Sequence, residues 1–216
     1  MDLQEQLARQ IDRFEQEAPP GRSELYRRMR DELRKSFRLE DALSLGDTAP
    51  DFTLPEARGR SFTLSEVLRD GPVVLTFYRG GWCPYCNIQL RAYQAALPEI
   101  RQLKATLAAI SPQTPDASLS TAEKDALEFD VLSDHGNEVG RAFGLVYKLA
   151  PELREVMKGN GKPLSQFNGD DSWDLPVPAT YVVAPNGRIA LAYVETDHRQ
   201  RLASEDILIA LRQLNA

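Results

Sequence analysis

The first 45 residues alternate charged and apolar side chains with the period of a helix. Two series of apolar residues recur at steps of three and four, separated by the Ala-Pro-Pro-Gly segment at 18–21. We therefore predict two amphipathic helices joined by a turn, forming an N-terminal helical extension over residues 1–45. Their narrow apolar stripe must pack on the rest of the chain or on a second copy in a homodimer. The two series are Leu3, Leu7, Ile11 and Phe14, then Leu25, Met29, Leu33 and Phe37.

From Gly46 onwards, short apolar runs that are typical of strands replace the helical pattern. A hairpin is predicted around Gly59, and a strand buried on both faces is predicted over 72–78, where the apolar run is almost continuous. Strands and helices then alternate, an order that implies parallel pairing with right-handed crossovers. The next elements are predicted as a helix through 88–100, a strand at 105–110, a helix at 115–127 and a strand at 129–132.

The last third of the chain is less regular at first and then returns to strands. Residues 159–176 are polar and glycine-rich, and we predict a loop or insertion there. Two apolar runs, 179–183 and 189–194, flank an Asn-Gly pair, which is a strong hairpin signal. Ser204 is expected to cap a final helix. The whole pattern predicts an α/β domain with a central mixed sheet over residues 46–216.

Composition and charge narrow the class of protein. Of 216 residues, 42% are hydrophobic and 27% are charged, so the chain can bury a sizeable core. The formal net charge of −6, with both signs interspersed, argues against nucleic acid as a partner. No run approaches the roughly 18 apolar residues of a membrane span, and the first ten residues lack the pattern of a secretory signal. We therefore expect a cytoplasmic protein without a membrane partner.

The only two cysteines, Cys83 and Cys86, form a C-x-x-C motif where the strand over 72–78 meets the following helix. Free amides in the first helical turn and the helix dipole stabilise a thiolate there, lowering its pKa from about 8.5. Arg79 is expected to add to this effect. Two cysteines three residues apart can close a disulfide, and the two glycines before Trp82 are expected to leave room for a substrate or partner.

A zinc site is the alternative chemistry for such a cysteine pair. Tetrahedral zinc needs four nitrogen or sulfur ligands, and the chain offers only His135 and His198 beside the cysteines, in no recognisable spacing. Both histidines are expected in loops or at the surface. We therefore predict a redox site without metal or cofactor.

The segment Trp-Cys-Pro-Tyr-Cys resembles the active site of thioredoxins and glutaredoxins, and residues 46–195 resemble peroxiredoxins of the AhpC/TSA type. The second resemblance depends on residues 46–52, 77–78, 179–183 and 185–188. It implies a thioredoxin-like fold and a thiol-dependent peroxidase. In the family register, Cys86 attacks the hydroperoxide and forms a sulfenic acid. Cys83 then resolves it as a disulfide, and thioredoxin or a glutaredoxin-like donor reduces the pair.

The chain departs from the family pattern at two positions. Arg79 replaces the usual proline of the active-site loop, and Pro178 stands where an arginine is expected before a later strand. Pro178 instead resembles the cis-proline that thioredoxin-fold oxidoreductases place against their disulfide. Arg79 or Arg91 is then the candidate to orient the peroxide. The substrate-binding residues predicted in this way are Arg79, Tyr78, Trp82 and Pro178.

Two other functions fit the same motif. In a thioredoxin-like thiol-disulfide oxidoreductase, Cys83 is the exposed nucleophile and Cys86 the buried resolving residue, so the two roles are exchanged. In a non-catalytic redox sensor, the disulfide changes how the helical extension binds a partner.

Overall fold

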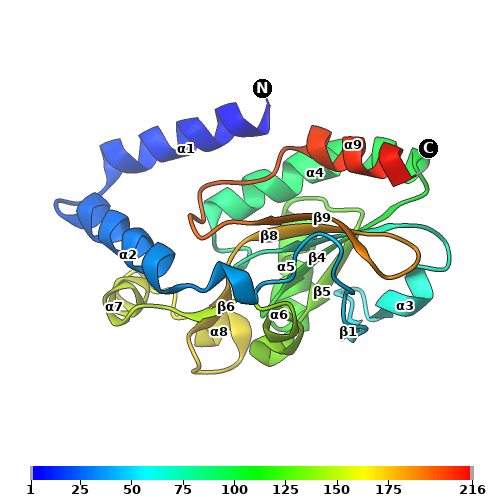
Figure 1. The fold of residues 1–216 in the computed structure, drawn as a ribbon. Helices are drawn as coiled ribbons and strands as arrows, with labels where there is room; N and C mark the ends of the chain where they lie inside the picture. Colours follow the sequence, from blue (N-terminus) through cyan, green and yellow to red (C-terminus); the bar gives the residue numbers. More distant parts are fainter. Residues whose placement is uncertain (1, 215–216) are drawn as a thin grey trace.

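A mixed sheet forms the centre of the molecule (Figure 1). The computed structural model describes residues 2–214. Within them, five strands pair in the order β5-β4-β3-β8-β9: β3 and β4 are parallel, β4 and β5 are parallel, and β8 is antiparallel to both β3 and β9. The predicted alternation of strands and helices is thereby confirmed. The strands are β3 (Val73–Phe77), β4 (Thr106–Ser111), β5 (Asp130–Ser133), β8 (Ala179–Val183) and β9 (Ile189–Val194).

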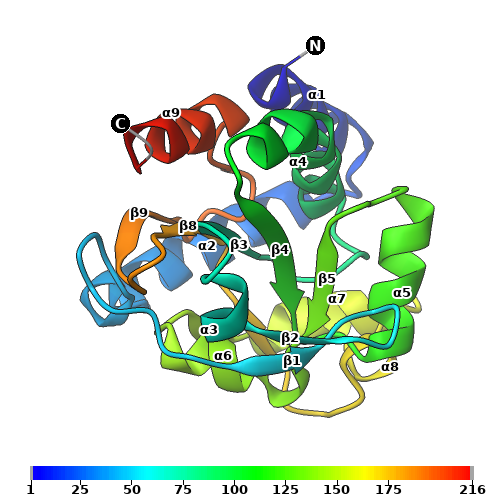
Figure 2. The same ribbon diagram turned by 90° about the vertical axis from the view of Figure 1, so that its right-hand side faces the viewer.

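Helices α4 (Pro84–Gln102) and α9 (Ser204–Leu214) cover one face of this sheet, and both ribbon views show α1 (Leu3–Glu17) on the same side (Figures 1 and 2). Their apolar residues join those of β3 and β4 in one core cluster. Helix α5 (Pro115–Lys124) contributes Ala122 to the same cluster. This face is the one that positions the cysteine motif, because α4 begins there.

The other face is covered by shorter elements. The hairpin of β1 (Thr53–Pro55) and β2 (Ser61–Thr63) lies there with α3 (Leu64–Val67) and α6 (Glu138–Ala142). Aromatic contacts fill the space beneath them, with the Phe77 and Phe143 ring centroids 4.9 Å apart. The hairpin predicted around Gly59 is confirmed.

The two predicted N-terminal helices are confirmed as α1 and α2 (Arg22–Ser36). Asp2 caps α1, since its side chain accepts a hydrogen bond from the Glu5 amide at 2.8 Å. Leu3 and Leu7 of α1 are buried in the cluster that includes α4, so the extension packs on its own chain and shares the main core. The division at residue 45 into extension and domain stays a prediction, as does the homodimer.

The segment predicted as an irregular insertion is more ordered than its sequence indicates. Strand β6 (Val146–Lys148) pairs with β7 (Asp174–Pro176), and α7 (Pro151–Gly159) and α8 (Ser165–Asn168) lie between them. Buried Trp173 packs in a small cluster with Met157 of α7. The prediction of a loop over 159–176 is wrong for α8 and β7, because a strand that pairs with a segment distant in sequence leaves no local apolar period. Short 3-10 helices occur at Leu39–Asp41 and His135–Asn137.

Candidate active site

The cysteine motif lies at the junction of β3 and α4, as predicted. Cys83 is the N-cap of α4 with an extended backbone, Pro84 is the first helical residue, and Cys86 lies in the first turn. The Cys83 amide donates to the carbonyl oxygen of Gly80 at 3.1 Å, and the Asn87 amide donates to the Cys83 carbonyl at 3.1 Å. The tight turn before the helix therefore places both sulfurs near its positive end.

The two glycines before Trp82 are required by close packing. A Cβ on Gly80 would lie 2.4 Å from Trp82 Nε1, and a Cβ on Gly81 would lie 2.2 Å from Thr121 Oγ1. Gly80 also has a φ of +141°, a backbone conformation that residues with a side chain rarely adopt. Trp82 and Thr121 therefore occupy the space directly beside the two glycines, while Gly81 and Trp82 also line a second cavity, so the expected room for a substrate or partner stays a prediction.

Both cysteines are free thiols and both are buried, with Cys83 1% and Cys86 0% exposed. The exposed Cys83 expected for a thioredoxin-like oxidoreductase is therefore wrong. Any chemistry at this pair takes place beneath the surface, where charges interact more strongly than in water.

Each sulfur meets the guanidinium of a different arginine. Arg201 Nη2 lies 3.3 Å from Cys86 Sγ, and Arg79 Nη1 lies 3.9 Å from Cys83 Sγ. Both arginines are more than nine-tenths buried, and neither forms an ion pair with a carboxylate among residues 2–214. Arg91, the other cation considered from the sequence, is exposed and pairs with Asp125 at 2.9 Å, so its predicted role is wrong.

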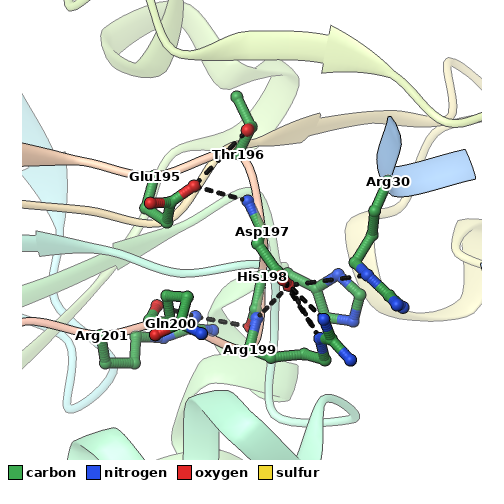
Figure 3. A network of polar contacts seen from close by, with 8 residues as sticks. All are labelled: Arg30, Glu195, Thr196, Asp197, His198, Arg199, Gln200 and Arg201. Atoms are coloured by element: carbon green, nitrogen blue, oxygen red, sulfur yellow. Dashed lines mark hydrogen bonds and ion pairs between the residues drawn. The ribbon is translucent and has the colours of Figure 1, made fainter. Parts of the chain in front are cut away.

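Arg201 is the residue beside Cys86 that the sequence analysis did not single out. It belongs to the connection between β9 and α9, where Figure 3 shows its side chain turned back along its own loop. Its Nη1 donates to the carbonyl oxygens of His198 and Gln200. The only signal in the sequence is a cluster of arginines after the last strand.

Two other elements fix the backbone around Arg201. Gln4 Nε2 of α1 donates to the Arg201 carbonyl oxygen at 2.9 Å, and the Tyr93 hydroxyl of α4 donates to the Leu202 carbonyl at 3.0 Å. Tyr93 is in turn within 3.2 Å of the Thr180 hydroxyl in the sheet. The N-terminal helix therefore contacts the loop that positions a guanidinium on Cys86.

The surroundings of the two thiols separate their pKa values. Burial disfavours the Cys86 thiolate. The hydrogen bond from the Cys83 thiol and the charges of Arg201 and Arg79 outweigh burial and hold the Cys86 pKa well below its usual range. Burial raises the Cys83 pKa, and the hydrogen bond and charge of Cys86 raise it further. The surroundings therefore favour a thiolate on Cys86 over one on Cys83.

The loop that includes Arg201 also brings His198 to the site. Its ring packs edge-on against Tyr85, with centroids 5.5 Å apart. Burial lowers the pKa of His198 well below its usual value, and the charges of Arg79 and Arg201 lower it further, so the imidazole is neutral. His198 lies in a loop as predicted, but it lines a cavity beside the cysteines. Figure 3 shows the neighbouring Asp197 between Arg30 and Arg199, which it pairs with at 3.8 and 2.8 Å.

A cavity of about 180 Å³ lies against this site. Helices α1, α2 and α7 contribute Phe14, Tyr26 and Met157 to its wall, and the active-site loop contributes Cys83, with Pro84 and Tyr85 beside it. Cys86 is not among the described residues that line it. The cavity therefore opens onto Cys83, the residue that the family resemblance assigns as the resolving cysteine.

The remaining predicted site residues fall into two groups. Arg79 and Trp82 line the cavity together, with the Arg79 guanidinium 4.9 Å from the Trp82 ring centroid. Tyr78 is fully buried directly after β3, and burial raises the pKa of its hydroxyl. Neither Tyr78 nor Pro178 is among the described residues lining the cavity.

Pro178 precedes β8 with a trans peptide bond, since residues 2–214 contain no cis bond. The predicted cis-proline is therefore wrong. Its carbonyl oxygen accepts a hydrogen bond from the Glu195 amide at 3.1 Å, which joins β8 to the end of β9.

The described part of the chain contains no cluster of three or more His, Cys, Asp or Glu side chains that could hold a metal ion. Among its helices, none is both long and apolar enough to cross a membrane.

A mixed sheet with a buried cysteine in the first turn of the helix that follows β3 is typical of thioredoxin-like proteins. The chain belongs to the AhpC/TSA family, whose model matches residues 45–192. The resemblance of residues 46–195 to AhpC/TSA peroxiredoxins, stated from the sequence, is confirmed.

Chloroplastic peroxiredoxins Q are among its relatives. Those of Gentiana triflora and Sedum lineare are 28% and 30% identical over 151 and 148 residues, which are 70% and 68% of this chain. The aligned parts are 59% and 67% of those two proteins, so the chain spans about three fifths to two thirds of their length. The crystal structure of peroxidoxin BcpB from Mycobacterium tuberculosis aligns with a TM-score of 0.64 at 23% identity. The alignment covers 81% of this chain and 99% of that chain, which supports the fold.

Proposed function

We propose that the protein reduces a hydroperoxide with Cys86 as the attacking thiolate and Cys83 as the resolving thiol. The observation that supports this order is the Arg201 guanidinium, whose Nη2 lies 3.3 Å from Cys86 Sγ. With Arg79 it holds the Cys86 pKa well below its usual range, although the sulfur is fully buried. A thiolate is the nucleophilic form of cysteine, so Cys86 is the sulfur prepared to attack.

In the first step, the Cys86 thiolate attacks the terminal oxygen of the hydroperoxide and the O–O bond breaks. Cys86 becomes a sulfenic acid, and the alkoxide or hydroxide leaves with the electron pair of that bond. The Cys83 thiol, which donates its hydrogen bond to Cys86, is the nearest proton source for the leaving oxygen. Arg79 and Arg201 stabilise negative charge as it moves from sulfur to oxygen.

In the second step, the loss of charge on Cys86 changes the state of Cys83. Burial and the thiolate beside it raise the Cys83 pKa in the reduced protein. Once Cys86 is a neutral sulfenic acid, both guanidinium groups act on Cys83 alone, and its thiolate is favoured. The Cys83 thiolate attacks the Cys86 sulfur, the S–S bond forms, and the oxygen leaves as water after taking up a proton.

The family implies a hydroperoxide substrate and a thioredoxin-like reductant. We propose thioredoxin or a glutaredoxin-like protein as that reductant, and Arg79 with Trp82 as substrate-binding residues. We also propose a cytoplasmic location, supported by a sequence whose only two cysteines form this local pair, because structural disulfides are rare in a reducing compartment.

The thioredoxin-like alternative requires the opposite assignment, in which Cys83 is the thiolate and Cys86 stays protonated. The raised pKa of Cys83 and the lowered pKa of Cys86 favour the peroxidase order. Insulin reduction that is lost in Cys83→Ser, without any turnover of peroxide, would support the alternative.

The test follows hydrogen peroxide turnover with NADPH, thioredoxin and thioredoxin reductase. Cys86→Ser is expected to abolish peroxide-dependent NADPH oxidation. Cys83→Ser is expected to stop at a sulfenic acid, which dimedone traps on Cys86 and mass spectrometry locates. Dimedone labelling of Cys83 in Cys86→Ser, at the rate of the wild-type first step, would contradict the proposed order.

A further inference from the structure

The two sulfurs have different surroundings. Once they form a disulfide, this difference determines which of them an entering thiol meets. Cys83 lines the cavity of about 180 Å³, whereas Cys86 is fully buried against Arg201. A thiol that enters the cavity therefore meets Cys83. Attack there expels Cys86, whose lowered pKa makes it the better leaving group of the two.

The wall of the cavity is apolar around two positive charges. Phe14, Tyr26, Leu153 and Met157 provide the apolar part, from α1, α2 and α7. Arg79 and the exposed Lys162 also line the cavity, and among its described lining residues none is acidic. Such a site matches a compact molecule with a carbon skeleton and a negative group.

No carboxylate among residues 2–214 forms an ion pair with the buried Arg79 guanidinium. Only 6% of it is exposed, and its Nε has no hydrogen-bond partner in the described structure. Its contacts are the Trp82 ring, the Tyr147 side chain and the Cys83 sulfur at 3.9 Å. Formation of the disulfide removes the one thiolate charge of the pair, so an anion near Arg79 becomes more favourable in the oxidised protein.

We infer that this cavity binds a low-molecular-weight thiol carrying a carboxylate, which reduces the Cys83–Cys86 disulfide by attacking Cys83. The inference rests on the proposed function only in that peroxide is the natural source of the disulfide. It adds a second class of reductant, one small enough to enter the cavity that Cys83 lines.

The exchange balances with two small thiols. The first, as thiolate, attacks Cys83 Sγ; the Cys83–Cys86 bond breaks, and Cys86 leaves with the electron pair as a thiolate beside Arg201. A second thiolate attacks the sulfur of the bound small molecule, which releases the symmetrical small disulfide and the Cys83 thiolate. That thiolate takes up a proton from solvent, and the starting dithiol state returns.

The test compares 3-mercaptopropionate with cysteamine, which are similar in size and opposite in charge. The protein disulfide is prepared with dipyridyl disulfide, so the assay does not depend on peroxide. Each rate is divided by the rate of the same thiol with neutral 2-hydroxyethyl disulfide, which corrects for differences in thiol pKa. The carboxylate thiol is expected to be favoured on the order of tenfold. Its transient adduct is expected on Cys83 in acid-quenched peptide maps.

Lys162→Gln supplies a second measurement without altering the buried site. It is expected to lower the ratio of mercaptopropionate to cysteamine rates about threefold, since one of the two lining charges is lost. Lys124→Gln, an exposed lysine at the end of α5, is the matched control and should leave the ratio unchanged.

A corrected ratio near one, a ratio insensitive to Lys162→Gln, or an adduct on Cys86 would overturn the inference, as would reduction by thioredoxin alone. Failure of the proposed peroxidase function appears separately, as the absence of a Cys83–Cys86 disulfide after treatment with peroxide.

Discussion

At the scale of residues, two guanidinium groups make two neighbouring cysteines chemically different. The Arg201 guanidinium contacts Cys86, and the Cys83 thiol donates a hydrogen bond to it, so a thiolate on Cys86 is stabilised inside the protein. The Arg79 guanidinium lies farther from the sulfur of Cys83, and the raised pKa of Cys83 favours its protonated form. The helix start by itself favours a thiolate at both positions, so the hydrogen bond from Cys83 and the two arginines are what favour the charge on Cys86.

Arg201→Gln tests this assignment. Because the guanidinium lowers the Cys86 pKa, its removal raises that pKa towards the ordinary value of about 8.5. The thiolate is then lost over a range of pH in which the wild type keeps it. We expect the second-order rate with hydrogen peroxide to fall about tenfold or more at pH 7 and to recover partly at pH 9.

The measurement is the pH dependence of Cys86 alkylation by iodoacetamide, read by mass spectrometry, beside the peroxide rate. Arg91→Gln is the matched control, because Arg91 pairs with Asp125 on the surface and should leave both unchanged. An alkylation midpoint that does not move in Arg201→Gln would contradict the role of this residue.

At the scale of elements, the connection between β3 and α4 is held by packing that tolerates no side chain on Gly81. Its amide donates to Gln113 Oε1 at 2.7 Å and its carbonyl accepts from Asn87 Nδ2 at 2.9 Å. The glycine is thereby fixed between the loop after β4 and the first turns of α4. Thr121 of α5 lies directly against its Cα.

Gly81→Ala is expected to destabilise the protein by about 1–3 kcal/mol, because the new methyl group overlaps the buried Thr121 side chain. Urea denaturation followed by tryptophan fluorescence measures the free energy of unfolding. Gly159→Ala is the control, since no atom lies within 4 Å of a Cβ at that helix end, and its effect should stay within about 0.5 kcal/mol. Equal effects of the two substitutions would show that the contact with Thr121 is unimportant.

At the scale of the whole molecule, the N-terminal helices belong to the same core as the active-site helix. Leu7 is 2% exposed and lies in the cluster that contains Tyr93 and Leu211. Gln4 contacts the Arg201 loop, and Phe14 and Tyr26 close the cavity at Cys83. We therefore expect residues 2–214 to unfold as one cooperative unit.

Leu7→Ala tests whether residues 2–214 unfold as one cooperative unit. Loss of a buried leucine side chain is expected to cost about 2–5 kcal/mol, through lost apolar burial and the cavity that remains. Far-ultraviolet circular dichroism and tryptophan fluorescence should give the same shifted transition. Leu45→Ala, at a residue 70% exposed, is the control. A helical signal that disappears before the fluorescence change would show that α1 unfolds alone.

Local pattern was sufficient for many elements. The strands at 179–183 and 189–194 were predicted with the bounds that the structure has, because two apolar runs and an Asn-Gly turn are encoded within a few residues. The pairing of β6 with β7 was missed, because Val146–Lys148 and Asp174–Pro176 are short and stabilised by neighbours distant in sequence. The trans bond at Pro178 was also missed, since the resemblance, and no local signal, indicated a cis bond.

The sequence by itself determined the chemistry that is available: two cysteines, three residues apart, at the start of a helix after a buried strand. The spacing and the strand-to-helix junction are local properties, so they can be read along the chain. Only the tertiary structure showed which cysteine has surroundings that favour a thiolate and which one lines a cavity. Arg201 is 115 positions away from Cys86 and reaches it because β9, α9 and α1 converge there. The stabilisation of a buried charge depends on the groups around it in space, and no local pattern records them.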